Sequence, residues 1–147
     1  MLTDPSTAAC RLVTRLLDLW AAPIPDPADA LVRFSTVYTD PVTLNGTALP
    51  LTALVERAAA THVALERTGV EVLEVVAQDD KVVVAFAMTA RHIGTWPSTL
   101  GGVPPTGCTV TVRTIDVLTL TGGLVSGIWV VSDEAGMLSQ LGASLRR

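Results

Sequence analysis

The pattern of apolar and polar residues in the C-terminal half of the chain predicts a β-hairpin. Residues 109–121 are rich in Val, Thr, Ile and Leu and contain neither Pro nor Gly, a composition typical of a strand. Gly122-Gly123 can adopt the positive φ angles of a tight turn, and residues 124–131 then return as a second apolar strand. Arg113 and Asp116 are the only charged residues in this hairpin. Each of them needs an explanation, because an unpaired buried charge is costly.

The N-terminal half of the chain instead has apolar residues at helical spacing. Asp4-Pro5 and Asp26-Pro27 each combine a capping residue with a Pro suited to the first helical position. Gly69 is well placed to end a third helix. The stretches expected as helices are 5–20, 27–34 and 51–67, and Asp133 is expected to cap a short helical turn at 133–141.

The remaining segments are expected to be extended or turn. Residues 38–42 lead to a turn at Asn45-Gly46, and residues 70–77 and 81–92 predict two strands joined at Asp79-Asp80. Residues 94–107 contain four Gly and three Pro, which indicates a loop. Helices followed by antiparallel strands predict an α+β fold.

Length and composition favour one domain over residues 1–147, since 147 residues that are 49% apolar can bury a substantial core. The net charge of −4 offers no basic surface for nucleic acid or an acidic membrane.

The N-terminus lacks the pattern of a signal peptide, so a cytoplasmic location is expected. Cys10 and Cys108 are too few for a disulfide framework and are expected to be packed thiols.

Two aspartates are the first candidates for chemistry. Asp40 lies in an apolar segment fixed by Pro41, where it could be a pocket carboxyl with a raised pKa or a residue that hydrogen-bonds nearby backbone. Asp116 lies in the middle of a strand, on the face opposite Arg113. It could be a pocket acid or base, or a structural partner of Arg91 or Arg113.

Other polar and aromatic residues are candidates for lining a pocket: Tyr38, His62, His92 and Trp96. For His62, which lies on an apolar helix face, a satisfied histidine in the core or the pocket wall is the preferred interpretation. The sequence contains no phosphate-binding glycine loop, no nucleophile elbow and no HExxH motif. With two histidines in the chain, neither a Ser-His-Asp triad nor a metal site is expected, and no cofactor is predicted.

The motifs of the C-terminal half resemble those of the SnoaL-like polyketide cyclases. They are H-x-G at 92–94, PPTG at 104–107, I-D-V at 115–117, Trp129, and D-E-x-G-x-L-x-Q-L-G at 133–142. These cyclases belong to the superfamily of nuclear transport factor 2, ketosteroid isomerase and limonene epoxide hydrolase. The resemblance implies a curved antiparallel sheet wrapped as a cone around three N-terminal helices, with an internal pocket, and a homodimer.

The resemblance also implies a function. The expected protein is a cofactor-independent acid/base enzyme of polyketide-type biosynthesis, which closes a ring or opens an epoxide in a small apolar intermediate. Related isomerases and epoxide hydrolases carry a catalytic Asp at the position of Asp40, and the epoxide hydrolases pair it with a Glu. Glu66, Glu71 and Glu74 fall in that region of the chain, and Glu71 is preferred, with Glu66 as the alternative. In the family, the strand position that matches Asp116 points into the pocket.

One position departs from the family pattern. Aldol-type cyclases carry their acid/base Asp one residue after the position of Trp129, where this chain has Val130. Trp129 is expected in the core and at the substrate site, and Val130 in the pocket wall.

Two alternative functions stay open. One is a ketosteroid-isomerase-like enzyme, with Asp40 as base and Asp116 as neutral hydrogen-bond donor, and the other is a non-catalytic ligand-binding or dimerisation module.

Overall fold

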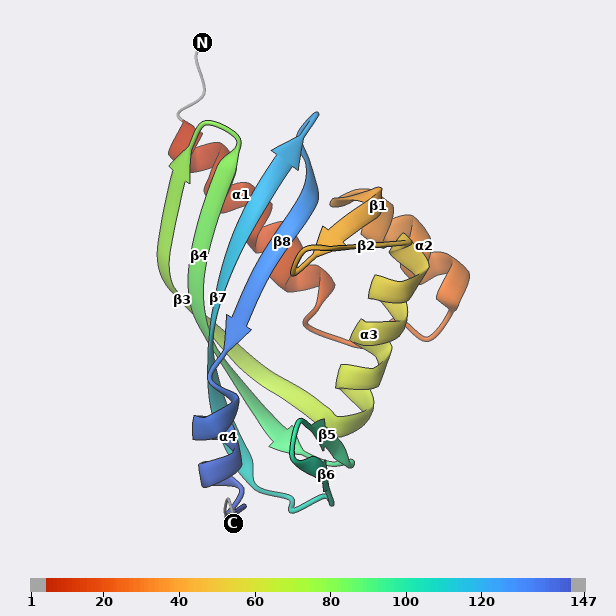
Figure 1. The fold of residues 1–147 in the computed structure, drawn as a ribbon, viewed down its shortest axis with the longest axis vertical. Coiled ribbons are helices and arrows are strands. Elements are labelled where there is room, and N and C mark those ends of the chain that lie inside the picture. Colours follow the sequence, from red (N-terminus) through yellow and green to blue (C-terminus); the bar gives the residue numbers. More distant parts are fainter. Residues whose placement is uncertain (1–4, 144–147) are drawn as a thin grey trace.

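The structure, a computed structural model, describes residues 5–143 and contains four helices and eight strands in that range (Figure 1). The helices are α1 (Pro5–Leu19), α2 (Pro27–Ser35), α3 (Leu51–Ala64) and α4 (Glu134–Gln140). The strands are β1 (Tyr38–Leu44), β2 (Thr47–Leu49), β3 (Leu65–Gln78), β4 (Lys81–His92), β5 (Trp96–Ser98), β6 (Gly101–Val103), β7 (Thr109–Thr121) and β8 (Leu124–Ser132).

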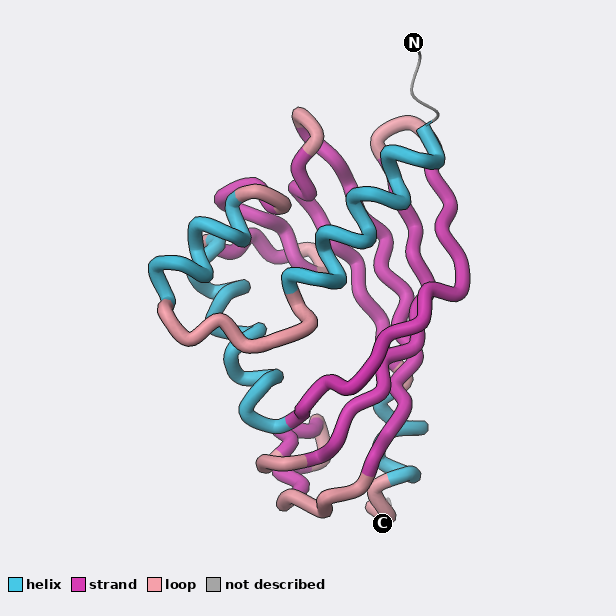
Figure 2. The backbone as a smooth tube through the Cα atoms, turned by 180° about the vertical axis from the view of Figure 1, so that it is seen from behind, coloured by secondary structure: helices cyan, strands magenta, loops and turns pink. Residues whose placement is uncertain are grey.

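Six strands form one curved sheet in the order β2-β1-β8-β7-β4-β3. Helix α1 crosses one face of this sheet, as Figure 2 shows from behind, and α2 and α3 lie beside β1 and β2 (Figure 1). The expected α+β cone is thus confirmed. One detail differs from the expectation of a purely antiparallel sheet, because β1 pairs with β8 in parallel. These two strands lie far apart in the chain, so a tight hairpin turn does not constrain their direction.

Alternation along the central strands creates the inner face of the sheet. In β4 every second residue from Val82 to His92 is buried, and in β7 every second residue from Val110 to Leu118 is buried. Since side chains alternate between the two faces of a strand, these residues all point toward the helices. Helix α1 contributes Leu12, Val13, Leu16 and Leu17 to the same core.

Several local predictions are confirmed. The two hairpin turns adopt positive φ angles at Asn45-Gly46 (48° and 85°) and at Gly122-Gly123 (59° and 80°). The Asp133 carboxylate accepts a hydrogen bond from the Gly136 N–H and caps α4. The segment 94–107 is less irregular than expected, because β5 and β6 pair with each other within it.

The end of α3 was predicted wrongly. The helix stops at Ala64, three residues before the expected end, and Leu65 is already extended, at φ −130° and ψ 126°. Leu65 is buried and pairs with His92 of β4. The strand ladder and the burial of Leu65 override the helical propensity of Glu66 and Arg67. Both residues therefore belong to β3, and Gly69 does not end the helix.

Trp129 does not lie in the core. It is 60% exposed and pairs with Val117, whose side chain faces away from the helices. Its ring packs against the turn at Gly46, where an added Cβ would lie 3.3 Å from Cη2 of Trp129. The even-numbered residues of β7 are the buried ones, and directly paired residues share a face, so Trp129, as the partner of the odd-numbered Val117, is turned outward.

Candidate active site

The inner face of the sheet, α1 and α3 line a half-open cavity of about 420 Å³. Most of its lining is apolar, including Leu16, Leu54, Phe86 and Met88. The polar and charged residues in the lining are Asn45, Arg57, Thr61, Arg67, Thr114, Asp116, Ser132 and Glu134, together with the hydroxyl of Tyr38 and the indole N–H groups of Trp20 and Trp96. An apolar cavity with a few convergent polar groups is the usual form of a small-molecule site.

Asp116 is the most deeply buried acid in this lining, with 7% of its surface exposed. Its cross-strand neighbours are Val84 on β4 and Val130 on β8, so neither adjacent strand offers it a hydrogen bond. Its Oδ1 atom has no partner among the described residues. Burial raises the pKa of Asp116 to about 6, and the positive charge of Arg67 opposes that rise. Asp116 can therefore gain and lose a proton near neutral pH.

Arg67 lines the same cavity from β3, and sequence reasoning missed it. It pairs with Ala90, which is fully buried, and so it shares the inner face. Its Nε atom has no hydrogen-bond partner within residues 5–143, and burial lowers the pKa of its guanidinium. The ion pairs found in that range do not join Arg67 to Asp116. The two groups thus influence each other across the cavity and leave space between them.

Tyr38, which the sequence suggested as a pocket residue, lines the same cavity as Arg67 and Asp116. The Trp20 indole N–H donates to the Tyr38 hydroxyl at 2.8 Å, and Phe34 stacks on the Tyr38 ring with centroids 5.8 Å apart. Burial raises the pKa of Tyr38, so the hydroxyl stays protonated. Since its oxygen accepts from Trp20, its own hydrogen remains available to donate into the cavity.

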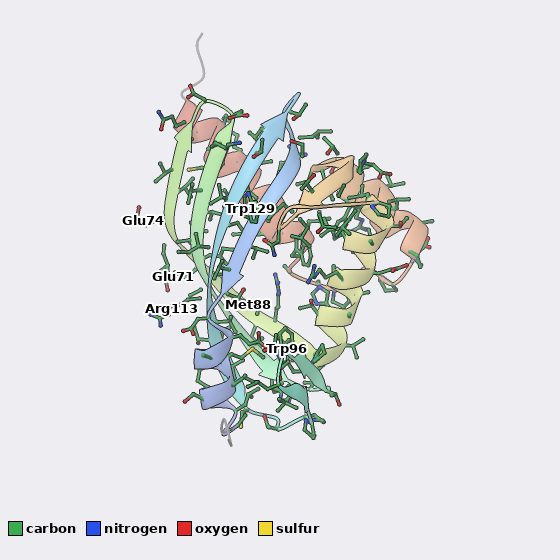
Figure 3. The ribbon with its side chains drawn as sticks, viewed as in Figure 1. Glu71, Glu74, Met88, Trp96, Arg113 and Trp129 are labelled. Atoms are coloured by element: carbon green, nitrogen blue, oxygen red, sulfur yellow. The ribbon has the colours of Figure 1, made fainter. Side chains whose placement is uncertain are left out.

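Trp96 reaches the cavity from β5, and Figure 3 shows it beside Met88 in the space between the sheet and α3. Its Nε1 atom is buried without a partner in the described part of the chain. Only four buried side-chain atoms of that part lack partners, and three of them belong to cavity residues: Arg67, Trp96 and Asp116. Buried groups left unpaired cost stability, and such a cluster is expected where a ligand or water completes the hydrogen bonds.

Asp40 lies outside the cavity. It is exposed, and its Oδ1 accepts a hydrogen bond from the Leu51 N–H at 3.0 Å, at the start of α3. The first N–H groups of a helix have no partner within the helix, so a carboxylate there is well satisfied. Of the two interpretations left open by the sequence, the structure supports a residue bound to backbone rather than a pocket acid.

The glutamates also point away from the cavity. Glu66 lies 4.0 Å from Arg91 on the outer face, and Figure 3 shows Glu71 and Glu74 directed outward. Strict alternation from Arg67 would turn Glu71 inward, but β3 is irregular between Arg67 and Gly69 and again between Val72 and Glu74. The first irregularity shifts the phase of the strand, so Glu71 pairs with Ala87 on the outer face.

The other predicted pocket residues are divided between several places. Val130 lines the cavity, whereas Trp129 does not. His62 borders a second cavity of about 320 Å³ between α2 and α3, and burial lowers its pKa. His92 is fully buried, and its Nδ1 accepts a hydrogen bond from the Thr106 N–H at 3.2 Å. His92 therefore holds the loop that carries Trp96, rather than lining the cavity.

The raised pKa of Asp116 predicts how stability depends on pH. Between its ordinary pKa of 3.8 and the folded value of about 6, the folded state binds more protons than the unfolded chain. The free energy of unfolding should therefore fall as the pH rises through this window, by on the order of 3 kcal/mol. Asp116→Asn removes this dependence. Urea unfolding of both proteins from pH 4 to pH 7 should show the variant gaining stability relative to the wild type, and parallel curves would contradict the assignment.

Within residues 5–143, no helix is long and apolar enough to cross a bilayer. In the same range, His, Cys, Asp and Glu side chains form no group of three that could hold a metal ion.

Comparisons with known proteins agree with this architecture. The chain matches TsrD from Streptomyces laurentii at 19% identity and a TM-score of 0.77, covering 97% of this chain and 100% of that one. It matches a structure from Jannaschia sp. CCS1, assigned to the SnoaL-like polyketide cyclases, at 22% identity and a TM-score of 0.75, covering 99% of each. A SnoaL-like polyketide cyclase from Agrobacterium tumefaciens matches at 15% identity and a TM-score of 0.74, covering 97% of this chain and 100% of that one.

At these identities the structural matches establish the fold. No curated protein sequence matches the chain. The family pattern of the SnoaL-like polyketide cyclases, however, matches residues 10–141, nearly the whole chain. The fold, the cavity and this match lead to one assignment: the chain belongs to the SnoaL-like polyketide cyclase family.

Proposed function

We propose that this protein is a cofactor-independent acid/base enzyme that closes a ring in an apolar polyketide-type intermediate, with Asp116 as the proton-transfer group. One observation carries the proposal. A carboxyl with a pKa of about 6 and a half-buried arginine, Arg67, line the same apolar cavity without pairing with each other. General acid–base catalysis is most efficient when the pKa of the group lies near the operating pH.

The chemistry needs only the residues of the cavity. Ionised Asp116 removes a proton from the carbon next to a substrate carbonyl, and the carbonyl oxygen becomes an enolate oxygen. The guanidinium of Arg67 stabilises that negative oxygen. This electrostatic interaction is stronger in an apolar cavity than in water. The enolate carbon then bonds to a second carbonyl carbon of the same molecule, and Asp116 returns its proton to the new alkoxide. The concave shape of the cavity favours ring closure because it holds both ends of the substrate together.

The position of Asp116 supports this assignment. In aldol-type cyclases that resemble this chain, the acid/base Asp occupies the position of Val130. Asp116 pairs directly with Val130 across β7 and β8, and both line the cavity. Directly paired residues on one face have Cβ atoms only about 4.5–5.5 Å apart. The carboxyl function is therefore retained near the same point of the cavity, from the neighbouring strand.

Asp116 and Arg67 in the cavity favour an isomerase over an epoxide-opening enzyme as the alternative function. Isomerisation of a β,γ-unsaturated ketone begins with the same proton removal, so an isomerase is the second candidate. Epoxide opening by Asp40 paired with Glu66 or Glu71 has less support, because these three residues lie outside the cavity, where Glu134 is the carboxylate that accompanies Asp116. A non-catalytic ligand-binding role remains as an outcome of the experiment.

A test needs no knowledge of the natural substrate. The apolar ketone 2-tetralone exchanges its α-hydrogens for deuterium when a base removes them, and mass spectrometry follows the exchange. The protein is expected to accelerate exchange in D₂O, with a rate that rises with pH through about 6 as Asp116 ionises. Exchange no faster than with free acetate at the same concentration would leave ligand binding as the function.

We further propose that the protein forms a homodimer through the outer face of the sheet. The register places seven apolar residues side by side there: Val76, Val83, Ala85, Ile115, Val117, Trp129 and Val131. Glu71 and Glu74 border this apolar face on β3, and Arg113 borders it on β7 (Figure 3). A second copy fits best, because a two-fold contact buries the apolar centre and lets the acidic edge of one copy approach Arg113 of the other, which lies 3.2 Å from Asp133 of its own chain.

Val131→Lys is expected to convert this dimer into a monomer. Val131 is 74% exposed, so the substitution leaves the core unchanged but places a charge within the contact. Size-exclusion chromatography with light scattering measures the mass. Val32→Lys, on α2 and 65% exposed, is the matched control and should remain dimeric. A monomeric wild-type protein would refute the interface.

A further inference from the structure

The charged residues of the main cavity lie on two opposite sides. Arg57 and Arg67 come from α3 and the start of β3, whereas Asp116 and Glu134 come from β7 and the start of α4. Thr61 lies one turn after Arg57 on the same side of the cavity and is uncharged, so this side carries positive charge only. The cavity is therefore electrically polarised, although the chain as a whole carries a net charge of −4.

Three of these four charges are already accounted for. Asp116 and Arg67 form the proposed catalytic pair, and Glu134 lies in the first turn of α4, where the helix dipole favours an anion. Arg57 is different. Its guanidinium makes neither an ion pair nor a hydrogen bond to any described residue, and it is exposed at the cavity wall.

The position of Arg57 on α3 directs it toward a ligand. Leu54, Arg57 and Thr61 follow one another at helical spacing, and all three line the cavity. The Thr61 hydroxyl donates to the Arg57 carbonyl oxygen at 3.0 Å, so it can still accept a hydrogen bond but adds no further donor. Among the described cavity residues of α3, the free donor group is thus the planar guanidinium of Arg57, which matches a carboxylate in a two-point contact.

We propose that the cavity selects substrates that carry a free carboxylate, which Arg57 binds at the α3 wall while the reacting carbonyl lies between Arg67 and Asp116. This proposal rests on the proposed function for the position of the reacting carbonyl. A carboxylate fits better than a phosphate, because phosphate groups are usually held by several donors, and Arg57 is the one guanidinium left at this side when Arg67 binds the reacting carbonyl. Arg57 is a specificity-determining residue, and a substrate esterified at this group loses the contact.

The experiment compares 2-naphthoate with methyl 2-naphthoate by isothermal titration calorimetry, which is independent of any turnover. The wild-type protein should bind the carboxylate more tightly than the ester. Arg57→Gln should weaken carboxylate binding by at least about tenfold and leave ester binding unchanged. Arg57→Lys should restore part of the preference. Arg33→Gln, which removes an exposed arginine paired with Asp29 on α2, is the matched control and should bind both probes as the wild type does.

Two results would overturn the proposal. One is equal binding of the acid and the ester by the wild-type protein, and the other is an equal loss of both probes in Arg57→Gln. Failure of the proton-transfer proposal has a different signature, since the preference for the acid would persist while deuterium exchange was absent.

Discussion

Replacing Asp116 with Asn is expected to lower the cavity-dependent rate of deuterium exchange into 2-tetralone by about 10²–10⁴-fold. Asn has nearly the shape of Asp but cannot take up a proton, so the cavity stays intact while the base is lost. The pH dependence of the remaining rate should also lose its rise near pH 6, since that rise reports the ionisation of Asp116. Mass spectrometry across pH 4.5–8 measures both effects.

Two control variants test the alternative site that the sequence suggested, with Asp40 and Glu71 as the catalytic carboxylates. Asp40→Asn should keep the wild-type rate, because an Asn oxygen can still accept from the Leu51 N–H. Glu71→Gln should also keep it, because Glu71 lies on the outer face. A large loss in Asp40→Asn together with full activity in Asp116→Asn would transfer the base to Asp40 and refute the proposed mechanism.

Replacing Arg67 with Met is expected to have the second-largest effect. Met fills much of the same space without the charge, so the enolate oxygen loses its stabilising partner and the rate should fall by about 10²–10³-fold. The pKa of Asp116 should move in a predictable direction. The charge of Arg67 opposes the effect of burial, so its removal should raise this pKa further, above about 6. A carbon-13 NMR titration of the Asp116 carboxyl measures the shift directly.

Arg91→Met is the matched control, because Arg91 lies on the neighbouring strand but near Glu66 on the outer face. It should change neither the rate nor the titration of Asp116. If Arg67→Met lowered the pKa of Asp116 or left it unchanged, the two groups would not interact across the cavity and the assigned role of Arg67 would be wrong.

The sequence was sufficient for most of the fold. The bounds of β4 and β7 and the turn at Gly122-Gly123 agree with the predictions, because the apolar runs are long and the turn residues are distinctive. The inward direction of Asp116 also follows from simple alternation, since it shares a face with the buried Val112 and Leu118.

The rest of the site depends on features that act over long distances. Arg67 was overlooked because its segment has helical propensity, and only pairing with β4 makes it a strand residue that faces inward. Reading residues 65–67 as the start of a strand would have found it, since Leu65 and Arg67 then share the apolar face. The outward turn of Glu71 depends on an irregularity in pairing between Arg67 and Gly69, whose local signal is the glycine within the strand, which was read as the end of a helix.

The buried carboxyl of Asp116 has a consequence for how this protein can evolve. Above pH 6 the folded chain carries a destabilising charge in its interior, so a substitution that deletes the carboxyl makes the fold more robust. A lineage selected for stability alone would lose this residue readily, in a single step from Asp to Asn. A descendant that keeps the cavity but has Asn at this position is therefore expected to be a sturdier protein that binds ligands without transforming them.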